Sequence, residues 1–160
     1  MGSETEAGSD VDNPGGSTGG AGAVKPYYQD DAVTIYHGDC RVILPQLPAF
    51  DLLLTDPPYG IGADRNLRAN TKYGRAAAIS RDYGPGGWDT ETPSAETFEL
   101  IISKSRRAII WGGNYFGLPP SPAWLVWDKD NGATRYADCE LAWTNLNQSV
   151  RSIRFRWMSA

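Results

Sequence analysis

The chain has 160 residues, of which 41% are hydrophobic, and a formal charge of −4, a composition that fits one modest folded domain. It holds no apolar run as long as a membrane span, no signal peptide in its first 24 residues, and too few cysteines for a disulfide framework. We therefore expect a cytoplasmic protein with two free thiols and no membrane partner. Since no Cys/His pair has zinc spacing, we also expect no metal site.

Residues 1–24 differ from the rest of the chain. They are rich in Gly and Ser, and they contain acidic side chains but neither Lys nor Arg. So polar a segment cannot bury enough apolar surface to offset its ordering entropy, and we expect it to be a disordered acidic tail. Residues 25–160, the predicted domain, carry 15 acidic and 15 basic side chains. Because this domain is neutral, any surface for nucleic acid must be a local basic patch.

Apolar and β-branched runs predict six strands in this domain. They cover residues 33–36, 50–55, 108–111, 124–127, 140–143 and 152–155. The run at 50–55 is apolar enough to be buried on both faces, as in a parallel sheet. The large rings of Trp124, Trp127 and Trp143 are expected in the core.

Two helices are expected between the first strands. A short one fits residues 40–47, before a proline. The second is expected to begin with Thr92 as N-cap and to end at the basic pair 106–107, as the helix dipole prefers. Its buried stripe would consist of Phe98, Ile101 and Ile102. Alternating elements followed by a run of strands imply an α/β fold with a mixed sheet and an antiparallel edge.

The most informative feature follows the predicted strand at 50–55, where the sequence reads Asp56-Pro57-Pro58-Tyr59. The Asp56 carboxylate and the Pro57 carbonyl can accept both N–H bonds of an exocyclic amine, which stabilises the charge that develops when its nitrogen attacks. The prolines fix the backbone and present carbonyls only. Tyr59 offers a ring on which a base extruded from a duplex can stack. The alternative is a proline-punctuated turn after a buried strand.

These four residues resemble the DPPY motif of the amino-methyltransferases, which methylate adenine N6 or cytosine N4 in DNA. The similarity runs from about Val33 to the C-terminus and includes residues 36–40, 55–62 and 111–116. The chain resembles the amino-terminal, target-base half of permuted, beta-type DNA adenine methylases of bacteria and phages, some of which belong to restriction-modification systems. The resemblance implies a partial class I, Rossmann-like methyltransferase sheet, S-adenosylmethionine as cofactor and double-stranded DNA as partner. Asp56 favours adenine as the target, with cytosine N4 as the alternative.

The ends of two other predicted strands carry residues that the resemblance places beside the cofactor, together with Asp56. Asp39 would accept a hydrogen bond from the adenine amine of S-adenosylmethionine, although it also fits a helix N-cap. Paired glycines at the second strand end would let the backbone approach a ligand closely, although a simple strand-to-loop turn explains them equally well. The residues at this second end are Trp111, Gly112, Gly113 and Asn114.

A long segment, residues 60–88, follows the motif and is unusually basic. Loops of this length in a compact domain are usually functional. Positive charge beside a base-binding slot suits phosphate contacts, so we expect a lid that touches DNA, with a solvated loop as the alternative. The predicted DNA-binding residues are Arg65, Arg68, Lys72, Arg75 and Arg81.

Permuted methylases of this type carry a second half with an Asp-Pro-Phe-x-Gly-x-Gly turn that binds the methionine part of the cofactor. The sequence ends at Ala160 before such a turn appears. We therefore expect a truncated enzyme, a half that needs a second polypeptide to supply the cofactor site, or an inactive DNA-binding remnant. The sequence leaves these three alternatives open.

Overall fold

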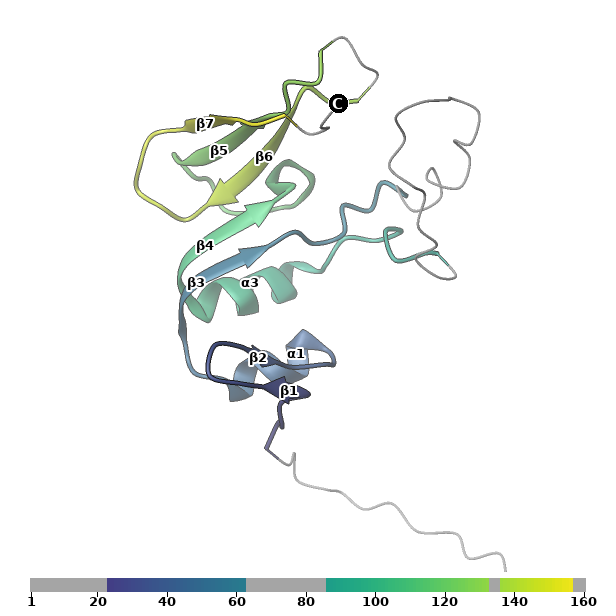
Figure 1. Ribbon diagram of the computed structural model, residues 1–160, viewed down its shortest axis with the longest axis vertical. Coiled ribbons are helices and arrows are strands. Elements are labelled where there is room, and N and C mark those ends of the chain that lie inside the picture. The colour runs from purple at the N-terminus through teal and green to yellow at the C-terminus, as the bar shows by residue number, and fades with distance from the viewer. Residues whose placement is uncertain (1–22, 63–85, 133–135, 157–160) are drawn as a thin grey trace, which may run out of the picture. The chain divides into compact units, whose positions relative to one another are not determined.

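The computed structural model describes residues 23–62, 86–132 and 136–156, and the chain divides into two compact units (Figure 1). The first unit is Met1–Tyr36 and the second is His37–Ala160. The second unit carries the five-stranded sheet and the motif at Asp56–Tyr59, so it contains the candidate site.

In the first unit, the described residues form a two-stranded antiparallel hairpin of β1 (Tyr28–Gln29) and β2 (Thr34–Ile35). Asp30 organises its turn, because its side chain accepts hydrogen bonds from the backbone N–H groups of Ala32 at 2.8 Å and Val33 at 2.7 Å. Local carboxylate-to-backbone bonds of this kind are typical of tight turns. The strand expected at 33–36 therefore exists, but it pairs with β1 and not within the larger sheet.

The second unit contains a mixed sheet with the strand order β3-β4-β6-β5-β7. The β3–β4 and β5–β7 pairs are parallel, whereas β6 runs antiparallel to both of its neighbours. This mixed sheet is compatible with the predicted α/β fold. The expected antiparallel edge is wrong, because the antiparallel strand β6 is internal and the edge strands β3 and β7 run parallel to their neighbours. The strands are β3 (Phe50–Thr55), β4 (Ser105–Trp111), β5 (Trp124–Asp128), β6 (Cys139–Thr144) and β7 (Arg151–Arg154).

Short helices precede and connect the first two strands of this sheet. The expected helix at 40–47 is observed as α1 (Cys40–Ile43) continued by the 3-10 turn η1 (Leu44–Gln46). The longer α3 (Ala95–Ser103) links β3 to β4 and runs alongside them (Figure 1). A second 3-10 turn, η2 (Gly113–Tyr115), follows β4.

The core lies between α3 and one face of the sheet. Phe98 and Ile101 of α3 are buried against Ala108 and Ile110 of β4 and Trp143 of β6. Leu53 and Trp124 pack against this cluster from the same face. The predicted helix stripe and two of the three predicted core tryptophans are therefore found here.

The other face of the sheet is more open. Leu52 and Leu54 of β3 are 50% and 62% exposed, so the expectation that β3 is buried on both faces is wrong. Leu52 and Leu54 are exposed because α3 covers only the face of the sheet to which Leu53 contributes. Trp127 lies outside the core cluster, on the open face. It pairs with Glu140, which is three positions from Trp143 along β6, and successive side chains of a strand alternate between the two faces of a sheet.

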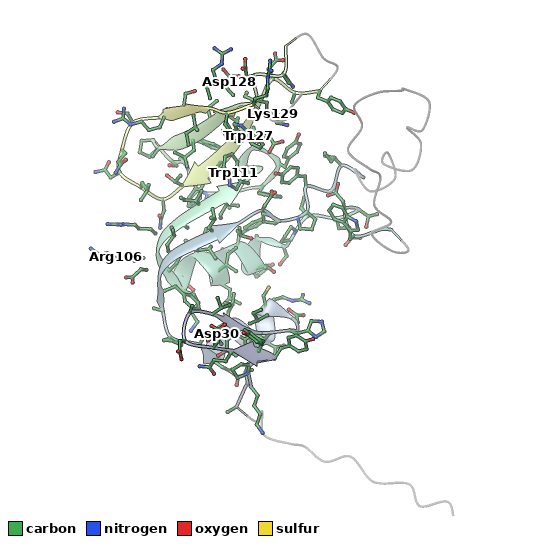
Figure 2. All side chains as sticks on the ribbon, viewed as in Figure 1. Asp30, Arg106, Trp111, Trp127, Asp128 and Lys129 are labelled. Atoms are coloured by element: carbon green, nitrogen blue, oxygen red, sulfur yellow. The ribbon has the colours of Figure 1, made fainter. Side chains whose placement is uncertain are left out.

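Two details of α3 differ from the prediction. Its N-cap is Ser94, whose side chain accepts a hydrogen bond from the N–H of Thr97, and not Thr92. Arg106 and Arg107 do not end the helix but belong to β4, where both are exposed. Figure 2 shows Arg106 projecting away from the sheet. β4 begins directly after Lys104, the C-cap of α3. Arg106 and Arg107 are therefore successive residues of a strand and lie on opposite faces of the sheet.

Candidate active site

Asp56–Tyr59 leaves the carboxyl end of β3 beside the carboxyl end of β4. Thr55 pairs with Ile110 in the parallel register, so Asp56 and Trp111 are the next residues of adjoining strands. Asp56 is exposed, and the two prolines and Tyr59 are half-buried. Ligands of open α/β sheets collect at such strand ends, so the structure places the motif where a site is expected.

Within the motif, Tyr59 orients the catalytic candidate Asp56. The hydroxyl of Tyr59 donates a hydrogen bond of 2.5 Å to Oδ1 of Asp56. Among the residues that the structure describes, the second oxygen, Oδ2, accepts no hydrogen bond. One carboxylate oxygen is therefore fixed by the protein, and the other remains available to an incoming N–H group.

Electrostatics keep the Tyr59 hydroxyl in its donor state. Burial raises its pKa most, the hydrogen bond to Asp56 and the charge of that carboxylate raise it further, and the carboxylate of Glu140 adds to the rise. The pKa of Tyr59 therefore lies above its usual range. The hydroxyl stays protonated at any physiological pH, and Asp56 remains the acceptor.

The ring of Tyr59 is packed against the segment that follows β4. It stacks on Tyr115 of η2, with ring centroids 4.9 Å apart and an interplanar angle of 9°. Phe116 meets it edge-on at 6.1 Å and connects to the core through Phe98 at 4.7 Å. The two motifs predicted from sequence, 56–59 and 111–116, are thus in direct contact through their aromatic rings.

The glycines of that segment make this packing possible. Gly112 is left-handed, with φ 68°, and a Cβ on it would lie 2.6 Å from Cδ1 and 2.7 Å from Cζ of Tyr59. A Cβ on Gly113 would lie 2.5 Å from Cβ of Trp143 and 3.1 Å from Cζ3 of Trp124. The Cβ position of Gly112 is therefore filled by the Tyr59 ring, and that of Gly113 by Trp143 and the Trp124 ring. Asn114, the next residue, is exposed.

Beyond Trp111, a charged pair lies on the open face of the sheet. The rings of Trp111 and Trp127 meet edge to face at 6.2 Å, and the Lys129 ammonium lies 5.7 Å from the Trp127 ring centroid (Figure 2). Lys129 is buried and forms an ion pair with Glu140 of β6. Because Glu140 acts on the Tyr59 hydroxyl, this pair belongs to the electrostatic surroundings of the motif.

Asp39 caps α1, one of the two roles that its sequence context allows. Its side chain accepts the backbone N–H of Arg41 at 2.8 Å and forms a salt bridge with the guanidinium of the same residue at 2.6 Å. The hydrogen bonds from Arg41 lower the pKa of Asp39 to about 2. In the described structure, no hydrogen bond or ion pair joins Asp39 to the motif residues.

The sequence analysis did not single out Asp89, which contacts the residues directly after the motif. Its carboxylate is buried and accepts the N–H of Gly60 at 2.9 Å, while its backbone carbonyl accepts the N–H of Gly62 at 2.9 Å. The only sequence signal was its position between a Gly-rich stretch and α3. The Lys129–Glu140 pair was likewise not predicted, since Lys129 follows β5 and Glu140 lies in β6, eleven residues further along the chain. The five basic residues predicted to bind DNA lie outside the described residues.

The described residues do not form a fitted site for S-adenosylmethionine. Protein atoms fill the Cβ positions of Gly112 and Gly113, and the carboxylate of Asp39 is engaged by Arg41. What this edge of the sheet offers is an oriented carboxylate beside a stacked aromatic pair, which suits a planar ligand that carries an N–H donor.

No helix of the described segments is long and apolar enough to cross a membrane.

One comparison with known proteins gives a match. A segment of 42 residues is 48% identical to the Type II methyltransferase M.ScaI of Streptomyces caespitosus, covering 25% of this chain and 14% of that protein. The chain therefore matches only a small part of that relative's length. No family model and no solved structure matches the chain. Over this segment, the chain is related to a methyltransferase.

Proposed function

We propose that this chain carries the target-base half of a DNA methyltransferase that acts on the N6 amine of an adenine rotated out of the duplex, with S-adenosylmethionine as the source of the methyl group. The observation that carries the proposal is the Asp56 carboxylate, oriented by Tyr59 at the carboxyl end of β3. The partial match to a Type II methyltransferase supports the same class.

In this proposal, the two oxygens of Asp56 have different tasks. Oδ1 is held by the Tyr59 hydroxyl, and Oδ2 accepts one N–H of the target amine, while the Pro57 carbonyl takes the other. These contacts localise the nitrogen lone pair and stabilise the positive charge that develops on it, which is catalysis by preorganised groups. The stacked rings of Tyr59 and Tyr115 form a wall that keeps a planar base beside the carboxylate.

The partners follow from the same argument. We propose double-stranded DNA as the substrate, with phosphate contacts from Arg65, Arg68, Lys72, Arg75 and Arg81. Because the described residues do not fit the cofactor by themselves, we also propose that the remaining part of the cofactor site is supplied by further sequence or by a second polypeptide.

The test is nucleoside analysis of DNA from a bacterial host that lacks its own DNA methylases and expresses the complete reading frame. We expect N6-methyladenine, lost by at least 10²-fold in the Asp56→Ala variant, the scale for losing one such contact. Asp51→Ala, which removes an exposed carboxylate from β3, is the matched control and should leave the product unchanged. N4-methylcytosine would move the target to cytosine. No methylated base with an intact, DNA-binding protein would make the chain a binding module.

A further inference from the structure

Asp89 holds the turn that leaves the motif. Its Oδ1 accepts the N–H of Gly60 at 2.9 Å, and its main-chain carbonyl accepts the N–H of Gly62 at the same distance. Gly60 is the residue directly after Tyr59, and it is separated from Asp89 by 29 positions. Asp89 therefore connects the motif to the segment that enters α3, across a long stretch of chain.

The burial of Asp89 makes this contact informative. The residue is only 2% exposed, and a carboxylate removed from water is costly unless hydrogen bonds stabilise it. A charged acceptor also forms stronger hydrogen bonds with backbone N–H groups than a neutral one does. Asp89 is thus a fixed anchor, and the turn at Gly60 is held by it.

Gly60 is restrained from a second side. Its backbone is left-handed, with φ 71°, and a Cβ on it would lie 3.2 Å from Cγ2 and 3.3 Å from the backbone N of Thr92. The turn is thus enclosed between Asp89 and Thr92. Because Tyr59 precedes this turn directly, the Asp89 contact restrains the backbone at the residue that follows Tyr59, whose hydroxyl donates to Asp56.

We propose that Asp89 is a positioning residue of the active site, which sets the place of the Tyr59 ring and the Asp56 carboxylate through the N–H of Gly60. It does not touch the reacting atoms itself. The effect on catalysis rests on the proposed methyltransferase function, whereas the effect on the position of Tyr59 does not.

The variants Asp89→Ala and Asp89→Asn separate positioning from mere folding. Asn keeps an oxygen that can accept the Gly60 N–H, whereas Ala removes it. Ile101→Val trims a buried core side chain of α3 far along the chain from the turn, so it is the control for general loss of stability. All three are measured in the full chain.

The first readout is structural and needs no substrate. By NMR, Asp89→Ala should lose the hydrogen-exchange protection of the Gly60 amide and the ring-to-ring NOE between Tyr59 and Tyr115. Asp89→Asn and Ile101→Val should keep both. If Asp89→Ala keeps both signals, or if Ile101→Val loses them equally, the positioning role is overturned. If Asp89→Ala unfolds the chain, Asp89→Asn decides the positioning role. It must then retain the NOE and show a Gly60 exchange rate within a few-fold of wild type.

The second readout is catalytic, in the complete enzyme. Asp89→Ala should lower kcat by about 10–100-fold, the cost of a misplacement near 1 Å, with little change in the KM for DNA. Asp89→Asn should restore most of kcat. Loss of the NOE with unchanged kcat would reject the catalytic part of the proposal. A wild-type enzyme without methyl transfer would instead reject the proposed function and leave the NMR result to decide the role of Asp89.

Discussion

The aromatic ring of Tyr59 occupies the place that a side chain on Gly112 would take, since a Cβ there would come within 2.6 Å of Cδ1 of that ring. Gly112 is also left-handed, and its N–H donates to the carbonyl of Leu141 in β6 at 2.9 Å. The motif after β3 and the turn after β4 are therefore fitted to each other. The fit of Tyr59 against the turn therefore requires glycine at position 112.

Replacing Gly112 with Ala should therefore displace Tyr59. The new Cβ would meet the ring, and the left-handed backbone is unfavourable for Ala, so we expect a loss of about 2–4 kcal/mol in the free energy of unfolding. Gly117→Ala is the matched control, because nothing lies within 4 Å of its added Cβ. Urea unfolding and the Tyr59–Tyr115 NOE measure the two effects. Equal stability of the two variants would show that the ring moves away without cost.

Local pattern was sufficient for most of the fold. The apolar run of β3 and the β-branched start of β2 are visible in the sequence, and so is the stripe of Phe98 and Ile101 on α3. The predicted start of α3 is wrong because Thr92 and Ser94 are both good N-cap residues, and the local sequence does not decide between them. Pairing of β2 with β1 could not be predicted, since strand partners are set by tertiary contacts.

The candidate site was predicted in part for the same reason. Asp56 and Tyr59 lie three positions apart in the sequence, so they can be recognised together as a motif. The stacking of Tyr59 on Tyr115 and the support from Asp89 join residues that are far apart in the chain. Such contacts depend on the register of β3 with β4, which a single sequence does not specify.

The ion pair between Lys129 and Glu140 should respond asymmetrically to neutralisation. The Lys129 side chain is 8% exposed, whereas that of Glu140 is 33% exposed. Glu140→Gln removes the carboxylate that pairs with this buried ammonium and should lower the free energy of unfolding by up to about 3 kcal/mol. Lys129→Met keeps an unbranched apolar chain at this position and leaves a carboxylate that water can reach, so it should cost less. Urea unfolding checks the order, and a larger loss in Lys129→Met would contradict it.

The titration of Asp39 should depend on Arg41. Hydrogen bonds from the Arg41 side chain, and then from its backbone N–H, hold the pKa of Asp39 at about 2. A depressed pKa means that the stabilisation is complete above the unfolded pKa of about 3.9 and is lost as the pH falls through about 2. Arg41→Ala should raise the pKa of Asp39 toward its ordinary value. A ¹³C NMR titration of the carboxyl carbon measures this, and an unchanged midpoint would rule out the contact in solution.

S-adenosylmethionine should bind this chain weakly or not at all in isothermal titration. The Cβ positions of Gly112 and Gly113 are filled by protein atoms, and Asp39 is engaged by Arg41. Binding in the micromolar range, about −8 kcal/mol, would show that the cofactor site lies elsewhere on the chain. A weak heat signal that strengthens when further sequence or a partner polypeptide is added would support a shared site.

The basic stretch after the motif should supply the affinity for DNA. Outside the acidic tail the chain is neutral, yet five basic residues fall between positions 65 and 81. Phosphate contacts release counterions, and each lost contact lowers the slope of log affinity against log salt by about 0.9. Changing Arg65, Arg68 and Arg75 to Ala should therefore weaken binding to all duplexes alike and flatten the slope by roughly two to three units. The matched control removes the same charge from exposed positions of the sheet: Arg106, Arg107 and Arg151. If both triple variants flatten the slope equally, net charge alone governs binding. If neither does, the surface that contacts DNA lies elsewhere.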